Sequence, residues 1–314
     1  MKNRTSFYLL AMLMASVVCL ASCARQSSVQ TETLVNAGTK TFCYKDSCRH
    51  LILSLSLEVP MGEDSASLQI RDSLIADFIL NANCPNYGED FHIKPYTGDM
   101  SDPQAIVEYY GKADYEYLYK LAKSDYDERL KYLNEDTTLT DEERQERSED
   151  VPVWGYDLNI KQITDTLGFV VYNSETYIYC GGAHGGVVGT GAMTFDKATG
   201  VKISNFILPD ATKALQPLIR KGLIHYYGEY GETMTDSELS DRLQIEGSVI
   251  PQPRMTPFPN ATGDSLIFTY GQYEIACYAD GMPSFALSVK DLIPYLTPES
   301  KALLIRKNSP ITPQ

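Results

Sequence analysis

The sequence predicts an α+β fold: a mostly antiparallel sheet packed with helices, in two parts. Alternation of apolar and polar residues, which is typical of strands, occurs in one early segment and again in several segments later in the chain. A long stretch with helical periodicity separates them. The chain has no regular alternation of strands and helices, which a wholly parallel sheet would require. It also has no internal repeat. We therefore expect helices to cover a sheet built largely from neighbouring hairpins.

The N-terminus has the features of a lipoprotein signal peptide. Lys2 and Arg4 precede an apolar run of about 14 residues, shorter than the roughly 20 that a membrane-spanning helix needs. The run ends in Leu-Ala-Ser-Cys at 20–23, which resembles the lipobox of bacterial lipoproteins. We expect residues 1–22 to be cleaved and Cys23 to carry the lipid. Ala24 rather than Asp follows, which in lipoprotein families favours the outer membrane, with the ectodomain in the periplasm or at the cell surface.

Residues 23–48 are expected to be a tether. The stretch 25–41 is polar and poor in large apolar side chains, so it cannot bury enough surface to fold alone. Cys43 and Cys48 lie close in sequence, and the cell envelope permits disulfides, so they either close a small loop or remain free thiols.

The part from 49 to 150 is predicted to hold one strand and a long helix. Leu51 to Val59 alternates apolar and polar residues, and a helix follows over 65–80 with Ser65 or Ser67 as its cap. After a loop at 81–102, Pro103 opens a helix that runs to Leu133. Its apolar stripe is expected at Ile106, Tyr110, Tyr117 and Leu121, and Gly111 is a potential interruption. The charged stretch 136–150 is expected to be a surface helix turn or a linker.

The part from 151 to 314 is predicted to begin with hairpins and to end with mixed elements. Its expected strands are 153–164, 168–180, 187–196, 201–203, 266–270 and 284–289. Its expected helices are 209–227, 235–244, 291–295 and 298–305, and the proline-rich stretch 250–259 is an extended loop.

The formal net charge is −14, and residues 1–22 contain two basic residues and no acid, so the chain from Cys23 onward carries −14 − 2 = −16. An acidic surface of this size argues against nucleic acid and against a polybasic membrane patch. It fits a basic partner, although solubility alone also explains it.

Two motifs of the second part resemble a known family. The first is Tyr-Ile-Tyr-Cys-Gly-Gly-Ala-His-Gly at 177–185, followed by Phe-Asp-Lys-Ala-Thr-Gly at 195–200. The second is Gly-Asp-Ser-Leu-Ile-Phe-Thr-Tyr-Gly-Gln-Tyr-Glu-Ile-Ala-Cys-Tyr-Ala-Asp-Gly at 263–281. In order and approximate spacing over 151–297 they resemble the extracellular domain of unknown function of RsiV anti-sigma factors. Residues 49–150 resemble the companion N-terminal segment of RsiV and of PdaC-type peptidoglycan deacetylases. The RsiV region binds lysozyme, so the resemblance implies a recognition domain whose partner is a basic protein such as lysozyme, or peptidoglycan.

The glycine loop and the tyrosines are the candidate ligand-binding residues. They are Tyr179, Gly181, Gly182, His184, Gly185, Tyr273 and Tyr278. Glycines let a ligand approach the backbone closely, and tyrosines offer area with a hydroxyl group. The structural alternatives are a tight strand connection around His184 and tyrosines that simply fill a core.

Three functions remain open: binding, a glycan-acting enzyme and a structural envelope protein. The enzyme would use His184, oriented by Asp196 or Glu274. No nucleophile elbow, HExxH motif or phosphate loop occurs in the sequence. The four histidines show no short metal-ligand spacing, so no metal and no cofactor are expected. Binding is the preferred interpretation.

Overall fold

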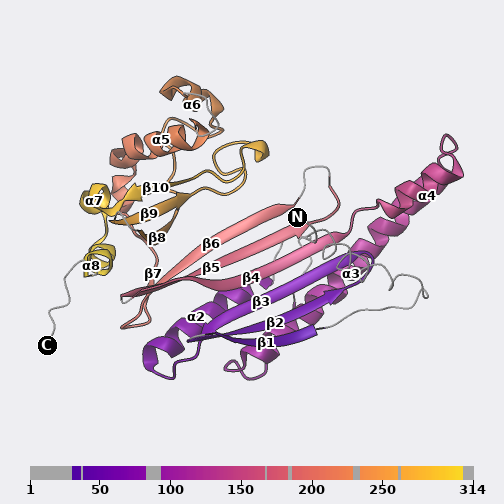
Figure 1. Ribbon diagram of the computed structural model, residues 1–314, viewed down its shortest axis with the longest axis horizontal. Helices are drawn as coiled ribbons and strands as arrows, with labels where there is room; N and C mark the ends of the chain where they lie inside the picture. The colour runs from indigo at the N-terminus through magenta and orange to yellow at the C-terminus, as the bar shows by residue number, and fades with distance from the viewer. Residues whose placement is uncertain are drawn as a thin grey trace, which may run out of the picture.

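A computed structural model describes residues 30–36, 38–82, 93–166, 168–182, 186–228, 234–260 and 263–306. Their architecture is α+β, as predicted, with a seven-stranded sheet and a separate three-stranded sheet (Figure 1). The large sheet has the order β1-β2-β3-β4-β5-β6-β7, and only the β3–β4 pair is parallel. The small sheet has the order β10-β9-β8 and is antiparallel. The expected signal peptide and Cys23 lie outside the described residues.

The strands of the large sheet are β1 (Gln30–Asn36), β2 (Thr39–Ser47), β3 (Leu51–Pro60), β4 (Trp154–Asp165), β5 (Phe169–Tyr179), β6 (Val187–Asp196) and β7 (Lys202–Ile203). Those of the small sheet are β8 (Arg254–Asn260), β9 (Gly263–Thr269) and β10 (Ser284–Ser288). The helices are α2 (Ser65–Ala82), α3 (Pro103–Glu135), α4 (Asp141–Glu149), α5 (Thr212–Gly228), α6 (Asp236–Arg242), α7 (Val289–Leu292) and α8 (Pro298–Arg306). Short 3-10 turns occur at Pro209–Ala211, Tyr278–Asp280 and Ile293–Tyr295.

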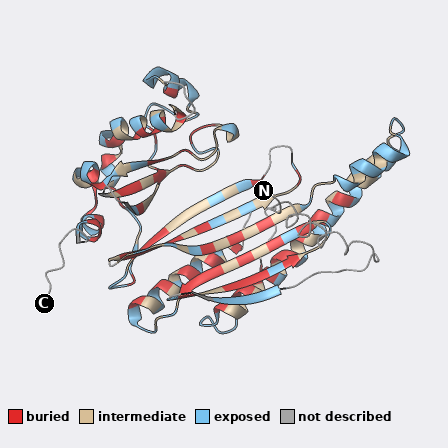
Figure 2. Cartoon of the chain, viewed as in Figure 1, coloured by how far each residue is buried: buried red, intermediate tan, exposed pale blue. Residues whose placement is uncertain are grey.

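Helices α2 and α3 cover one face of the large sheet (Figure 1). The alternation in β3 decides which face: Leu51, Leu53, Leu55 and Leu57 are buried in the core, whereas Ile52 is 57% exposed on the other face. Figure 2 shows the buried residues concentrated where these helices meet the sheet.

The long helix α3 begins at a regular cap, where the Asp102 side chain accepts a hydrogen bond from the Ala105 amide at 3.1 Å. Gly111 does not interrupt the helix. Instead, a Cβ there would overlap the ring of Tyr44, so glycine lets β2 pack closely against the helix. The buried stripe passes through Asp114, whereas Tyr117, which we expected in the stripe, is only partly buried.

Two other sequence expectations about the helix region need correction. Asp64, rather than Ser65 or Ser67, caps α2, because its carboxylate accepts from the Ala66 and Ser67 amides at 3.1 and 3.0 Å. Leu121, expected in the stripe of α3, is only partly buried as well.

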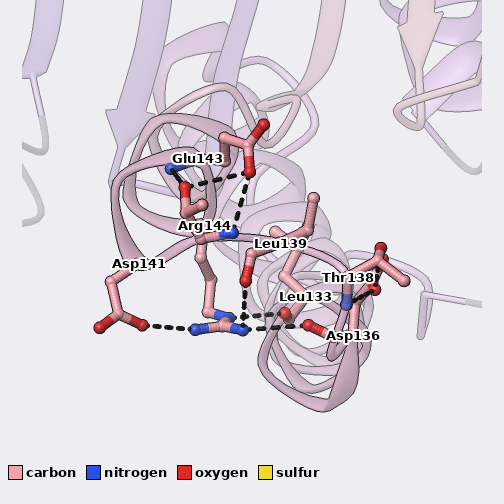
Figure 3. Close-up of polar contacts among 8 residues, drawn as sticks. Leu133, Asp136, Thr138, Leu139, Asp141, Glu143 and Arg144 are labelled. Atoms are coloured by element: carbon pink, nitrogen blue, oxygen red, sulfur yellow. Dashed lines mark hydrogen bonds and ion pairs between the residues drawn. The ribbon is translucent and has the colours of Figure 1, made fainter.

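The end of α3 and helix α4 form a projecting hairpin, the helical arm (residues 127–149; Figure 1). Its turn is held by Arg144, whose guanidinium donates to the carbonyls of Leu133 and Asp136 at 3.0 Å each and pairs with Asp141 at 2.8 Å (Figure 3). A capping box between Thr140 and Glu143 starts α4. Because α4 has no buried residue, these polar contacts fix the arm.

A second core lies between α5, the small sheet and α8. Strand β5 contributes to both cores, with Val170 and Tyr172 in the first and Phe169 and Val171 in the second. The parallel pair β3–β4 joins strands from before and after residue 150. The two parts expected on either side of that residue therefore share one sheet.

The expected tether is corrected by the structure, because 30–36 and 39–47 are strands of the large sheet. Phe42 and Tyr44 of β2 are buried in the first core, so this polar stretch is ordered by pairing with β3. Cys43 and Cys48 are both free. Five steps along an extended chain, with four residues between the two cysteines, separate their Cα atoms by about 16 Å, beyond the roughly 7 Å that a disulfide permits.

The proline-rich stretch at 250–259, expected to be a loop, contains most of strand β8. Pro257 lies opposite Leu266 in the pairing with β9. The strand is at the edge of its sheet, where the missing amide of a proline leaves no partner unpaired.

Candidate functional site

The two sequence motifs meet in space. The Tyr278 hydroxyl of the second motif donates to the carbonyl of Gly186, at the end of the glycine loop, at 2.9 Å. The amide of Val188, at the start of β6, donates to the Gln272 side chain, also at 2.9 Å. Contacts across 92 and 84 residues of chain thus join the loop after β9 to one end of β6.

Tyr273 is the most conspicuous residue of this junction. It is 60% exposed and has a φ of 61°, the only positive φ of a non-glycine residue in the described chain. Its ring lies 5.6 Å from that of Tyr278. A bulky residue in this conformation is strained, and the fold keeps it there while leaving the ring in solvent. We call the surface formed by Tyr177, Gly186, Gln272, Tyr273 and Tyr278 the motif surface.

Tyr177 and Tyr179, two positions apart on β5, lie on the same face of the sheet. Both side chains lie over Gly155 of β4, where an added Cβ would be 3.5 and 3.9 Å from them. Tyr177 is 38% exposed, and its ring fills the space that a side chain at Gly186 would need. Tyr179 is partly buried. A side chain at 186 would therefore have to displace the ring of Tyr177.

The N-terminal end of the glycine loop is hydrogen-bonded to helix α3. Arg129 donates to the Gly181 carbonyl at 3.3 Å and to Asp125 at 2.9 Å. Asp125 also accepts from the Trp154 indole at 3.0 Å. Burial, with a smaller contribution from Asp125, raises the pKa of the Cys180 thiol, which therefore stays protonated at neutral pH.

The other predicted residues are placed as follows. His184 and Gly185 lie outside the described residues. Gly181 is buried with a φ of 74°, a conformation that favours glycine, and Gly182 is exposed. Asp196, one of the two carboxylates considered for orienting His184, is at the opposite end of the ten-residue β6 from Gly186 and accepts from the amides of the following turn.

Glu274, the other carboxylate considered for orienting His184, does lie beside the motif surface. It accepts from the Gly271 amide at 2.6 Å and is 3.4 Å from Nη1 of Arg254. The first bond closes the turn that carries Tyr273. The second places the carboxylate at the border of a cavity between the two sheets.

That cavity has a volume of about 590 Å³. It is bordered by the end of α2, strands β5, β6 and β7, the chain at 204–207 and the start of β8. Its charged side chains are Asp77, Lys202, Arg254 and Glu274. Sequence reasoning missed Arg254, which lies in neither motif, and did not single out Gln272, although Gln272 lies within the second motif.

Among the residues that the structure describes, no three His, Cys, Asp or Glu side chains lie close enough to hold a metal ion. None of the described helices is both long and apolar enough to cross a bilayer. The chemistry that the described site offers is aromatic contact and hydrogen bonding.

Comparison with known proteins assigns part of the chain to a described family. Residues 204–290 match a family described as a protein of unknown function, DUF3298, so the chain carries a DUF3298 domain. The match includes the second motif. It begins at residue 204 and so does not include the glycine loop. None of the curated proteins gave a significant match.

Two solved structures are similar. A DUF3298 family member from Bacteroides fragilis is 15% identical with a TM-score of 0.57, over 90% of this chain and 98% of that one. A DUF3298 family protein from Pseudomonas aeruginosa is 14% identical with a TM-score of 0.45, over 87% and 96%. The first likeness shows a shared α+β fold.

Proposed function

We propose that the chain is an envelope-anchored lipoprotein whose ectodomain binds a basic protein such as lysozyme through the motif surface. One observation carries the proposal: Tyr273 is held in a strained backbone conformation with 60% of its surface exposed, at the point where the two motifs are hydrogen-bonded together. Strained residues cluster at functional sites, and tyrosine is enriched among the residues that dominate binding energy.

The charge of the chain supports a basic partner. The chain from Cys23 onward carries −14 − 2 = −16, which attracts a cationic protein over distances comparable to the Debye length and raises the association rate at low salt. Binding of this kind weakens as salt is added.

The test is calorimetry of the unlipidated chain from residue 24 with lysozyme, at low and physiological salt. We expect micromolar or tighter binding that weakens with salt. Tyr273→Ala should weaken it by about tenfold or more, since truncating a central aromatic residue costs on the order of 1.4 kcal/mol or more. Tyr132→Ala, which removes a similarly exposed ring (63%) from the helical arm, is the matched control and should leave binding unchanged.

Other results would select the alternatives. No binding at either salt refutes lysozyme as the partner, and peptidoglycan fragments are then titrated against the same variants. A turnover of glycan that disappears in His184→Ala, with fold and binding intact, would establish the enzyme instead. Absence of both would favour a structural envelope protein. Lipid anchoring is tested separately by palmitate labelling, which Cys23→Ala should abolish.

A further inference from the structure

Strand β6 has an edge that is only partly paired. Its one side pairs with β5 along the whole strand, but on its other side β7 reaches only Thr194 and Phe195 (Figure 1). An unpaired edge presents backbone groups that can accept another strand.

Two hydrogen bonds show which residues face this edge. The Asp196 amide donates to Val201 at 3.0 Å, on the β7 side, and the Val188 amide donates to Gln272 at 2.9 Å. Because backbone groups alternate sides along a strand, the amides and carbonyls of Thr190 and Ala192 point the same way. Within the described chain these groups have no hydrogen-bond partner on that side.

The cavity between the sheets lies along this edge, and Thr190, Gly191 and Ala192 border it. A Cβ added to Gly191 would come no closer than 4.0 Å to any other group, so the fold itself does not require glycine there. The missing side chain leaves room beside the unpaired backbone.

Arg254 provides an incompletely paired positive charge at one end of the edge. Its single ion pair within the described chain is the 3.4 Å contact of Nη1 with Glu274, and its buried Nε and Nη2 atoms have no acceptor there. The guanidinium packs against Gly271, the neighbour of Gln272, which bonds Val188. Arg254 is therefore at the end of β6 where that strand begins.

We propose that this cavity binds a short peptide with a free C-terminal carboxylate, which adds antiparallel to β6 and places its carboxylate on Arg254. The direction follows from the geometry, because a peptide antiparallel to β6 ends where β6 begins. Main-chain bonds to Thr190 and Ala192 supply affinity without sequence preference, and the guanidinium selects a free C-terminus. The site lies in the cavity, beside the motif surface, and this proposal does not rest on the proposed function.

The test uses tetraalanine and its C-terminal amide, titrated into the chain from residue 24 by calorimetry. We expect the free acid to bind at least tenfold more tightly than the amide. Arg254→Gln should reduce the acid to the affinity of the amide. Arg147→Gln, which makes the same change at an exposed position of the helical arm, should keep the preference. Failure of both peptides to bind the unsubstituted chain, or an unchanged preference in Arg254→Gln, would overturn the proposal.

Strand addition is tested by Thr190→Pro. This change removes an amide that bonds nothing in the described fold and places a ring on the open edge, so both peptides should lose binding. Hydrogen exchange gives a readout that needs no substitution: tetraalanine should slow exchange of the Thr190 and Ala192 amides and leave that of Val188 unchanged. Binding of the acid without this protection would show an anion site alone and refute strand addition.

Discussion

Asp114 makes the stability of the protein depend on pH in a direction opposite to that of most carboxylates. It lies in the buried stripe of α3, is 3% exposed, and its Oδ2 atom has no hydrogen-bond partner among the described residues. Burial raises the pKa of Asp114 well above the ordinary aspartate value. The folded protein therefore binds this proton more tightly than the unfolded chain does.

The sign of the pH dependence follows directly. Stability from this group is fully present below the unfolded pKa of about 3.9 and is lost as pH rises through the raised folded pKa. Capping carboxylates such as Asp64 and Glu143 act in the opposite direction, because hydrogen bonds to Ser67 and Thr140 lower their pKa values. Subtracting the wild-type curve from that of an Asp114 variant removes their contribution.

Asp114→Asn keeps the shape of the side chain and removes its charge. At pH 8 it should raise the free energy of unfolding by about 1–3 kcal/mol, because the neutral amide avoids the cost of ionising a buried group whose charge has no partner. Near pH 4 the difference should disappear. Urea denaturation from pH 4 to 8 measures it, with Asp241→Asn, an exposed aspartate of α6, as the matched control. A difference that does not vary with pH, or a variant that is less stable throughout, would refute the reasoning.

Three further outcomes are expected. Gly111→Ala should destabilise the fold by about 1–3 kcal/mol, because the new Cβ overlaps the ring of Tyr44, and a stability unchanged in urea denaturation would contradict this close packing. Arg144→Ala should free the turn carbonyls of the helical arm, so limited proteolysis should cut the arm first while the core melts as before; unchanged cleavage would show that the arm does not need this contact. Cys43 and Cys48 should both react with iodoacetamide in denaturant without prior reduction, and protection of the pair would indicate a disulfide.

The parts of the fold that could be predicted are those whose signal is local. The leucine alternation of β3 and the helix expected at 235–244 each depend on residues a few positions apart. Both appear in the structure, the helix as α6, which begins with a capping box between Thr235 and Glu238. Strand β2 was missed because Phe42, Cys43 and Tyr44 are buried in succession, which breaks the alternation. Strand β8 was missed because its prolines argue against a strand. They are compatible with one only at the edge of a sheet, and the sequence does not show that β8 is an edge strand.

The candidate sites depend on pairing between distant strands, which no local pattern encodes. The motifs indicated that the glycine loop and the second tyrosine segment belong together, and Tyr278 and Gly186 do meet. The cavity could not be predicted from the sequence. Arg254 lies in no motif, and the edge of β6 is open because β7 is two residues long. A short strand is visible in the sequence, but the strand that it leaves uncovered is not.

Glu274 connects the two proposed sites. Its carboxylate holds the turn that carries Tyr273, through the Gly271 amide, and also faces the guanidinium of Arg254 in the cavity. A peptide carboxylate on Arg254 would compete for the guanidinium with Glu274 and would leave that side chain with its backbone bond alone. Binding at the cavity should therefore change the affinity of the motif surface for its partner, and by linkage the partner should change peptide affinity by the same factor. Equal lysozyme affinities with and without saturating tetraalanine would show that the turn is held by the backbone bond alone.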